Sequence, residues 1–343
     1  MSENIKKIGK YLLTTLILVG SMYLAVRKID IQSLISELKT INWFWALIPI
    51  PIMILSHYIR AIRWKTILKP IIKPKSMLNL FSAVMVGYFF NNISPRGGEL
   101  LRPYVYAKRE KVSFSMVFAT IILERLLDVL TLLFLFVIAL IFAKDRIINA
   151  FPPGSNIANI LYLVLVLALI VALCFYPPVM QWILDKTIKP LSSKLYHKIG
   201  ELFEKFSRGF SVIKSPSEYL SLTLESLLIW TCYAIPMYLM FFCFNFSNHI
   251  SLGFLDALLL IIISGIGVSI APTPGGIGVF HYVVMIAMMK LYGLSSEEGF
   301  AYATINHLIN FGVQVILGLV FFLRERITKV PENIIINTSE EAI

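Results

Sequence analysis

Runs of apolar residues as long as a membrane span recur along the chain, and they constrain its fold more than any other feature. One of them covers residues 114–143, and about 20 apolar residues are enough for a helix to cross a bilayer. The composition agrees, because 57% of the 343 residues are hydrophobic and only 15% are charged, against about 25% charged residues in soluble domains. The sequence therefore predicts an all-α, polytopic membrane protein.

Basic residues gather in short stretches between the apolar runs and give the chain a formal net charge of +11. Lys and Arg are retained in cytoplasmic loops, where they also face anionic lipid headgroups, so a nucleic-acid partner is not expected. This pattern predicts a multi-pass protein of the cell membrane with both termini in the cytoplasm. The first apolar run, 11–26, lacks a small-residue cleavage site and is expected to remain as a span.

Six apolar runs are predicted to cross the membrane fully, and the amphipathic stretch 29–40 is predicted to lie at the interface. Residues 1–330 are expected to form one membrane domain, with a basic cytoplasmic linker at 180–215 and a polar cytoplasmic tail at 331–343. The segment 144–156 contains Pro-Pro-Gly and is expected to be an outside loop. The predicted spans are 11–26, 42–64, 114–143, 157–176, 217–244 and 300–323.

Two further apolar segments are interrupted by residues that end helices. The first breaks at Pro95 and at Gly97 and Gly98, glycines that are expected to allow unusual backbone conformations. The second, 251–293, breaks at the sequence APTPGGIG in 271–278. Both are interpreted as re-entrant helical hairpins, whose irregular tips are tolerated in a membrane only where protein or water surrounds them.

The order of these segments predicts an inverted repeat. Residues 42–143 and 217–323 each contain a span, a broken hairpin and a long span, and one crossing separates the two halves. The two halves therefore enter the membrane from opposite faces, which places a site where the two hairpins meet near the midplane. Residue-level similarity between the halves does not support the repeat, so it rests on the order of segments alone.

Charged residues cluster at the tip of the first hairpin, in residues 91–102 (NNISPRGGELLR). A charge at mid-bilayer depth costs roughly 2.5 kcal/mol or more, so these side chains must face one another, water or a charged ligand. Arg96 and Arg102 suit bidentate binding of phosphate, and Glu99 lies three residues from each. Two interpretations stay open: a pocket for an anionic headgroup, or an internal ion-pair knot that locks the hairpin.

A second charged cluster, 124–128 (ERLLD), lies inside an apolar span. Glu124 and Asp128 share a helix face, whereas Arg125 is expected to point about 100° away. The carboxylates are interpreted as partners of the arginines in the first hairpin or as a proton relay, and charge neutralisation alone explains them equally well. Neither a nucleophile nor metal-ligand spacing accompanies them, and the three cysteines lie in apolar runs, so a catalytic use of these carboxylates, a metal and a cofactor are not expected.

The break in the second hairpin places Gly275 and Gly276 before an apolar helix, whose free backbone N–H groups favour an anion. A simple turn is the alternative. His281 lies one turn later and is more typical of a buried core residue with hydrogen-bonded ring nitrogens than of a binding-site residue. The last span carries a polar stripe that suits interhelical hydrogen bonds as well as it suits the lining of a cavity. The stripe consists of Asn306, His307, Asn310 and Gln314.

Two arginines, Arg60 and Arg63, lie at the end of the second predicted span, 42–64. They are interpreted chiefly as side chains that snorkel to the cytoplasmic interface. Contact with a substrate phosphate is the alternative, and Arg63 is a candidate substrate-binding residue on that account.

Four motifs follow one another: RAIRW (60–64), the segment 91–102, ERLLD (124–128) and PTPGGIGVF (272–280). In this order they resemble the flippase-like membrane domain family, also called the lysylphosphatidylglycerol synthase transmembrane-region family, over about residues 10–325. His281 departs from the family, which usually has Glu there. The candidate substrate-binding residues are Arg63 and Asn92 together with eight residues on family motif positions: Arg96, Glu99, Arg102, Glu124, Arg125, Asp128, Gly275 and Gly276.

The resemblance implies a lipid translocase for an anionic headgroup, carried by a phospholipid or a polyprenyl-phosphate-linked lipid. It does not imply synthase activity, because we expect this chain to lack the soluble aminoacyl-transferase domain. Without a nucleotide-binding loop, transport is expected to be downhill or ion-coupled. The alternatives are a membrane-embedded transferase or its accessory subunit acting on lipid-linked substrates, and a lipid-binding scaffold. The expected partners are a membrane lipid and a separate soluble or membrane enzyme, and no oligomeric state follows from the sequence.

Overall fold

The regular secondary structure of the described residues is entirely helical. The structure is a computed structural model, and it describes residues 3–27, 29–69, 72–150, 156–173, 177–190, 193, 196, 200, 216–246 and 250–327. Within these ranges five helices are long and apolar enough to cross a membrane. The predicted all-α, polytopic fold class is therefore confirmed. The five helices are Trp43–Leu68, Phe114–Phe142, Ser217–Cys243, Pro274–Tyr292 and Ser296–Ile327.

The order of a long helix, a broken pair and a second long helix occurs twice. In the first half, the aromatic start α3 (Trp43–Leu47) leads across Pro49 into α4 (Ile50–Leu68). The pair α5 (Met77–Ile93) and α6 (Gly97–Glu110) and the long α7 (Phe114–Phe142) follow. The second half comprises α12 (Pro216–Cys243), α13 (Phe254–Ile270), the 3₁₀ turn η3 (Pro274–Gly276), α14 (Val279–Tyr292) and α15 (Ser296–Ile327).

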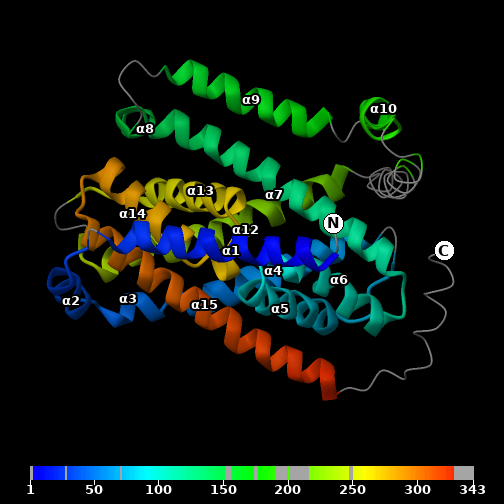
Figure 1. Ribbon diagram of the computed structural model, residues 1–343, viewed down its shortest axis with the longest axis horizontal. Helices are drawn as coiled ribbons and strands as arrows, with labels where there is room; N and C mark the ends of the chain where they lie inside the picture. The colour runs from blue at the N-terminus through cyan, green and yellow to red at the C-terminus, as the bar shows by residue number, and fades with distance from the viewer. Residues whose placement is uncertain are drawn as a thin grey trace.

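The two broken pairs enter the bundle from opposite ends. At one end, the Glu325 carboxylate near the end of α15 accepts hydrogen bonds from Ser82 on α5 at 2.5 Å and from Arg109 on α6 at 3.0 Å. At the other end, α14 finishes at Tyr292 and α15 begins at Ser296. Figure 1 shows α6 toward one end of the long helices and α14 toward the other. The order of apolar segments predicted this arrangement, although the division into repeat domains stays a prediction.

A close backbone contact holds the first pair together. A methyl group added to Gly98 would lie 1.8 Å from the carbonyl oxygen of Gly87, so α6 packs directly on the backbone of α5. The expectation of unusual backbone at Gly97 and Gly98 was wrong, because both lie in the first turn of α6 and neither has a positive φ. Arg96 takes the left-handed conformation instead, with φ 57° and ψ 16°.

Glycine conformation does explain the second break. Gly275, Gly276 and Gly278 have φ values of 59°, 75° and 81°, a region that costs other residues roughly 1–2 kcal/mol. The backbone at Gly275 also approaches the first pair, because an added methyl group would lie 2.8 Å from the Asn92 side-chain oxygen. The tips of the two broken pairs therefore touch.

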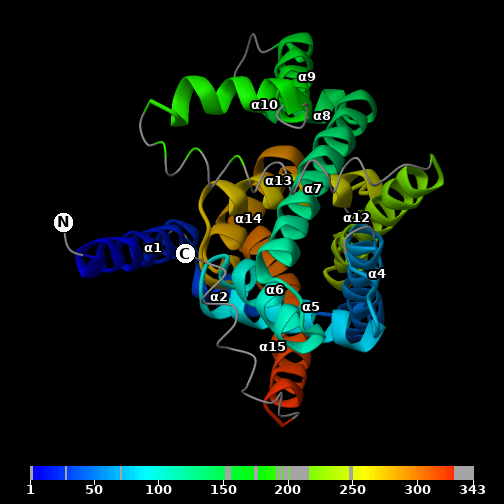
Figure 2. The same cartoon turned by 90° about the vertical axis from the view of Figure 1, so that its right-hand side faces the viewer.

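Several peripheral helices flank the bundle, among them α1, α9 and α10 in Figure 2. The predicted outside loop at 144–156 was wrong in its first half, because 144–150 is helical. Arg146 pairs there with Asp256 and Ile147 is 3% exposed, so packing against the bundle holds the residues that precede the Pro-Pro-Gly sequence in a helix. Most of the predicted basic linker, the predicted tail and Cys174 lie outside the described residues. The peripheral elements are α1 (Glu3–Val26), α2 (Ile31–Lys39), α8 (Lys144–Ala150), α9 (Ile157–Leu173), α10 (Pro177–Ile183) and the π-helix η1 (Leu184–Ile188).

The glycine contact predicts a stability effect. Gly98→Ala forces α6 away from α5, and overpacking of this kind costs about 1–3 kcal/mol. Thermal unfolding of the detergent-solubilised protein should therefore occur at a lower temperature. Gly312→Ala on α15 is the matched control, because its added methyl group meets no atom within 4 Å. Equal unfolding temperatures for the two variants would contradict the close packing.

Candidate functional site

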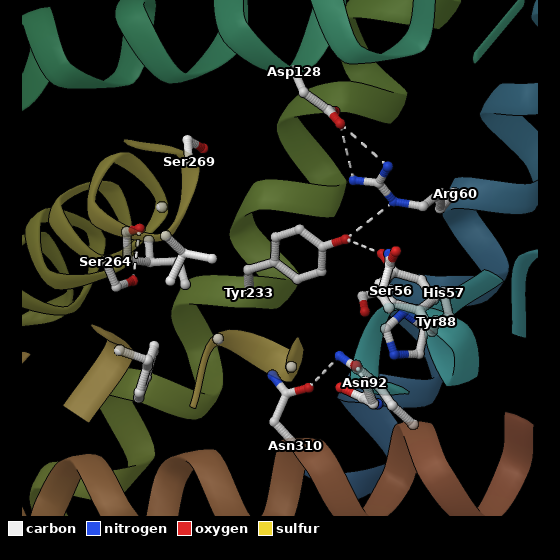
Figure 3. Close-up of a pocket in the computed structure, with 18 of the residues that line it drawn as sticks. Ser56, His57, Arg60, Tyr88, Asn92, Asp128, Tyr233, Ser264, Ser269 and Asn310 are labelled. Atoms are coloured by element: carbon white, nitrogen blue, oxygen red, sulfur yellow. Dashed lines mark hydrogen bonds and ion pairs between the residues drawn. The ribbon is translucent and has the colours of Figure 1, made fainter. Parts of the chain in front are cut away.

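A cavity of about 770 Å³ lies where the two broken pairs meet. Its walls come from both halves, with side chains of α4, α5 and α7 from the first half and of α12, α13 and α15 from the second (Figure 3). Seven of the predicted site residues line it. They are Asn92, Arg96, Glu99, Arg125, Asp128, Gly275 and Gly276.

The other three predicted site residues, Arg63, Arg102 and Glu124, lie behind the cavity wall in a buried ion-pair network. Each is at most 4% exposed. Arg102 contacts Glu124 at 2.9 Å, and its guanidinium stacks over the Trp64 ring at 4.0 Å. The prediction that carboxylates of the long span pair with arginines of the first hairpin is therefore confirmed for Arg102.

The interpretation of Arg60 and Arg63 as snorkelling side chains was wrong. Their exposed fractions are 4% and 0%, because α4 continues to Leu68 and holds both arginines inside the bundle. Arg60 donates two hydrogen bonds of 3.2 Å to Asp128 and one to Glu124. Arg63 donates to Asp128 at 2.6 Å and to Ser226 at 3.0 Å. Buried charges need such partners, since an isolated one would cost several kcal/mol.

The two predicted residues at the cavity rim, Glu99 and Arg125, pair with each other at 3.2 Å. Arg125 also reaches Asp128 at 3.3 Å, so its expected direction away from that carboxylate was wrong. A long side chain can turn back along the helix, which a helical wheel does not represent. The knot of Arg96, Glu99 and Arg102 does not form, because Glu99 and Arg102 each pair with a residue of α7.

Arg96 differs from the other arginines of the site. It is exposed and lines the cavity, and its guanidinium donates to the backbone oxygen of Ser269 at 3.1 Å. It makes no ion pair with a carboxylate of the described residues, so the prediction of such a pair was wrong for Arg96. Ser269 lies in the last turn of α13, where helix carbonyls lack partners and attract a cation. Most of the donors of Arg96 therefore remain available to a ligand.

Positive charge exceeds negative charge in this cluster. Three carboxylates, those of Glu99, Glu124 and Asp128, face five arginines, which leaves an excess of two positive charges. The carboxylates keep the arginines in place, and the excess favours an anion in the cavity. The five arginines are Arg60, Arg63, Arg96, Arg102 and Arg125.

Uncharged aromatic residues form a second part of the wall, which sequence reasoning missed. The Tyr233 hydroxyl accepts a hydrogen bond from Arg60 Nε at 3.1 Å and shares another with the Tyr88 hydroxyl at 3.0 Å (Figure 3). The His57 ring lies 4.3 Å from the Tyr88 ring, and its nitrogens have no hydrogen-bond partner among the described residues. Single aromatic residues in apolar spans resemble core residues in sequence, and it is the hydrogen bond from Arg60 to Tyr233 that connects this group to the charged cluster.

The polar stripe of the last span joins the two tips. All four of its residues line the cavity, and two of them also support the junction. Asn92 donates to the Gln314 side chain at 3.2 Å, and His307 Nε2 lies 2.8 Å from the carbonyl oxygen of Gly275. The stripe therefore both lines the cavity and makes hydrogen bonds between helices, as the two interpretations of the sequence proposed. His281 is buried outside the cavity lining, and its Nδ1 accepts the Gly278 N–H at the start of α14.

The described residues of this site do not form a metal-binding group. Among the described residues, no group of three or more His, Cys, Asp or Glu side chains is arranged to hold a metal ion. The carboxylates of the cavity are instead engaged by arginines. The arrangement is suited to holding an anionic group by charge and hydrogen bonds.

Comparisons with known proteins agree on one family. A family model described as "Lysylphosphatidylglycerol synthase TM region" matches residues 11–318. A UPF0104 membrane protein of Pyrococcus horikoshii is 25% identical over 287 residues, which cover 79% of this chain and 84% of that protein. A UPF0104 membrane protein of Methanocaldococcus jannaschii is 25% identical over 327 residues, which cover 90% of this chain and 94% of that protein.

The buried ion-pair network predicts that its central carboxylate is essential for stability. Glu124→Gln leaves arginine charges uncompensated inside the bundle, which costs about 3–5 kcal/mol. The variant should unfold at a clearly lower temperature, and adding Arg102→Met should recover part of the loss. Asp185→Asn is the control, because the ion pair of Asp185 with Lys189 is exposed and exposed pairs contribute little. If the Glu124 and Asp185 variants lost equally little stability, the network would not be holding these helices.

Proposed function

Because this multi-pass membrane protein belongs to the lysylphosphatidylglycerol synthase TM region family, we propose that it translocates a lipid with an anionic headgroup between membrane leaflets. The lipid is a phospholipid or a polyprenyl-phosphate-linked lipid, and the membrane is the cell membrane. The proposal rests above all on the excess of arginine in a cavity at the junction of the two broken helix pairs.

The depth of the cavity supports translocation. Its residues on the long helices are 53–60 of α4, 118–132 of α7, 230–237 of α12 and 306–314 of α15, which are all interior to their helices. A headgroup held there is far from both helix ends, as a molecule moving between leaflets must be at its halfway point. Charged groups at this depth are costly unless they serve a ligand or one another.

The arginines divide into two roles in this proposal. Those bound to Glu124 and Asp128 form a fixed positive wall that cannot collapse when the cavity is empty. Arg96 is the headgroup contact, because its guanidinium has unused donors and reaches the cavity from the tip of the first pair. A guanidinium binds phosphate oxygens in a bidentate geometry, which provides both affinity and orientation.

Reconstituted vesicles test the proposal. Wild-type protein should speed the exchange of a fluorescent anionic phospholipid between leaflets above the rate in protein-free vesicles, as followed by dithionite quenching. Arg96→Ala should slow this exchange roughly tenfold, as expected for the loss of one hydrogen bond to a charged group.

Arg27→Ala provides the matched control, because Arg27 is an exposed arginine that does not line the cavity. Its exchange rate should equal that of the wild type. Exchange that is unaffected by Arg96→Ala, or a wild-type rate no higher than that of empty vesicles, would refute the proposal. Formation of a new lipid product from a lipid-linked donor and an acceptor would favour the membrane-embedded transferase instead.

A further inference from the structure

One face of α7 lines the cavity and is exposed at the same time. Ile122 is 48% exposed, Val129 is 43% exposed and the Arg125 side chain is 42% exposed, and all three belong to the cavity wall. Their spacing of three and four residues places them on one side of the helix. The cavity wall is therefore open along this stripe of α7.

The tips of the two broken pairs form the other edge of the same opening. Arg96 and Ser269 are exposed and line the cavity, and the hydrogen bond between them joins the two tips. Beyond them, Ile93 is 58% exposed at the end of α5 and Ile270 is 79% exposed at the end of α13. The opening is thus framed by apolar side chains with a guanidinium on each edge, Arg96 and Arg125.

The opening lies at the depth of the hydrocarbon. Arg125 is about 17 Å from the first residue of α7 at 1.5 Å per residue, and a bilayer core is about 30 Å thick. The ends of the bundle are tied by polar contacts away from the cavity, such as Arg109 with Glu325 at one end and Arg146 with Asp256 at the other. The exposed residues of the cavity wall on α7 therefore lie on the side of the bundle, between these two ends.

We propose that this opening, between the Ile122–Arg125–Val129 stripe of α7 and the tips of the two broken pairs, is a lateral portal for the hydrocarbon chain of a lipid. The inference rests on the proposed function and specifies its ligand: an amphiphile that reaches the cavity from within the bilayer, and not a water-soluble anion. The chain lies against Ile122 and Val129 outside the cavity, while the phosphate lies inside between Arg96 and Arg125.

The chemistry of the frame supports an amphiphile. A soluble anion has no use for apolar side chains around its entrance, and it would have to cross hydrocarbon to reach an opening at this depth. A lipid suits this frame better, because its chain stays in the bilayer against the apolar side chains and only its charged headgroup has to move. Guanidinium groups at the edges also offset the loss of water from the phosphate as it passes.

A fluorescence experiment tests the portal without measuring transport. Ile122→Cys, in a background with Cys174, Cys232 and Cys243 changed to alanine, is labelled with bimane and reconstituted. The vesicles contain equal mole fractions of a chain-labelled doxyl quencher lipid with either a phosphatidylglycerol or a phosphatidylcholine headgroup. The anionic lipid should quench bimane at position 122 several-fold more strongly, because the arginines hold its headgroup nearby. Arg96→Gln should reduce this difference.

Ile141→Cys is the matched control, because Ile141 is an exposed isoleucine of α7 that does not line the cavity. Both lipids should quench it equally. Equal quenching by the two lipids at position 122 overturns the portal even if leaflet exchange is observed. A change in bimane emission with inorganic phosphate but no headgroup preference also overturns it, since the ligand would then be a soluble anion. Headgroup-dependent quenching without leaflet exchange keeps the portal and refutes translocation.

A second pair of variants covers the case in which the cysteine-free protein does not fold. Ile122→Trp fills the opening and should reduce exchange of the anionic lipid to the protein-free rate, while Ile141→Trp should leave it unchanged. Both variants should elute as the wild type does in size-exclusion chromatography. Wild-type exchange by a folded Ile122→Trp protein would contradict the portal.

Discussion

The structure depends on two carboxylates of α7, Glu124 and Asp128, that are surrounded by arginines from α4 and α6. Ion pairs at this depth are not a source of large net stability, because the desolvation of each charge offsets much of the attraction. Their effect is to fix the positions of α4, α6 and α7 relative to one another. Three helices are fixed relative to one another by charges that cannot separate without exposing an unpaired ion to an apolar surrounding.

The cavity follows from this constraint. Because the carboxylates hold most of the arginines against α7, the space between the halves is not filled by side chains collapsing onto one another. Tyr233 and Tyr88 complete the wall from the other side through the hydrogen bond to Arg60. The tips of the broken pairs bound the cavity on a further side, where Asn92 meets Gly275. Fixed charge, aromatic hydroxyls and irregular backbone together form one polar space within an apolar bundle.

Apolar length, helix-breaking residues and charges inside apolar segments were sufficient to predict the fold class, both breaks and seven of the residues that line the cavity. Side-chain partners were harder to predict. Arg60 lies near the end of the predicted span 42–64, whereas α4 continues to Leu68, which the sequence alone does not show. The pairing of Glu99 with Arg125 depends on the packing of α6 against α7. Tyr233 carries no local signal, because its role arises from a contact 173 residues away in the chain.

The contact between Gly98 and Gly87 has a mechanical consequence. Two helices whose backbones touch cannot slide or bend relative to each other without a steric clash, so α5 and α6 behave as a stiff wedge. Any rearrangement between inward and outward states would then swing this wedge as a rigid body. The contacts that break in such a movement would be those at the tip of the pair, where hydrogen bonds from an amide and a guanidinium hold it, and not those between α5 and α6.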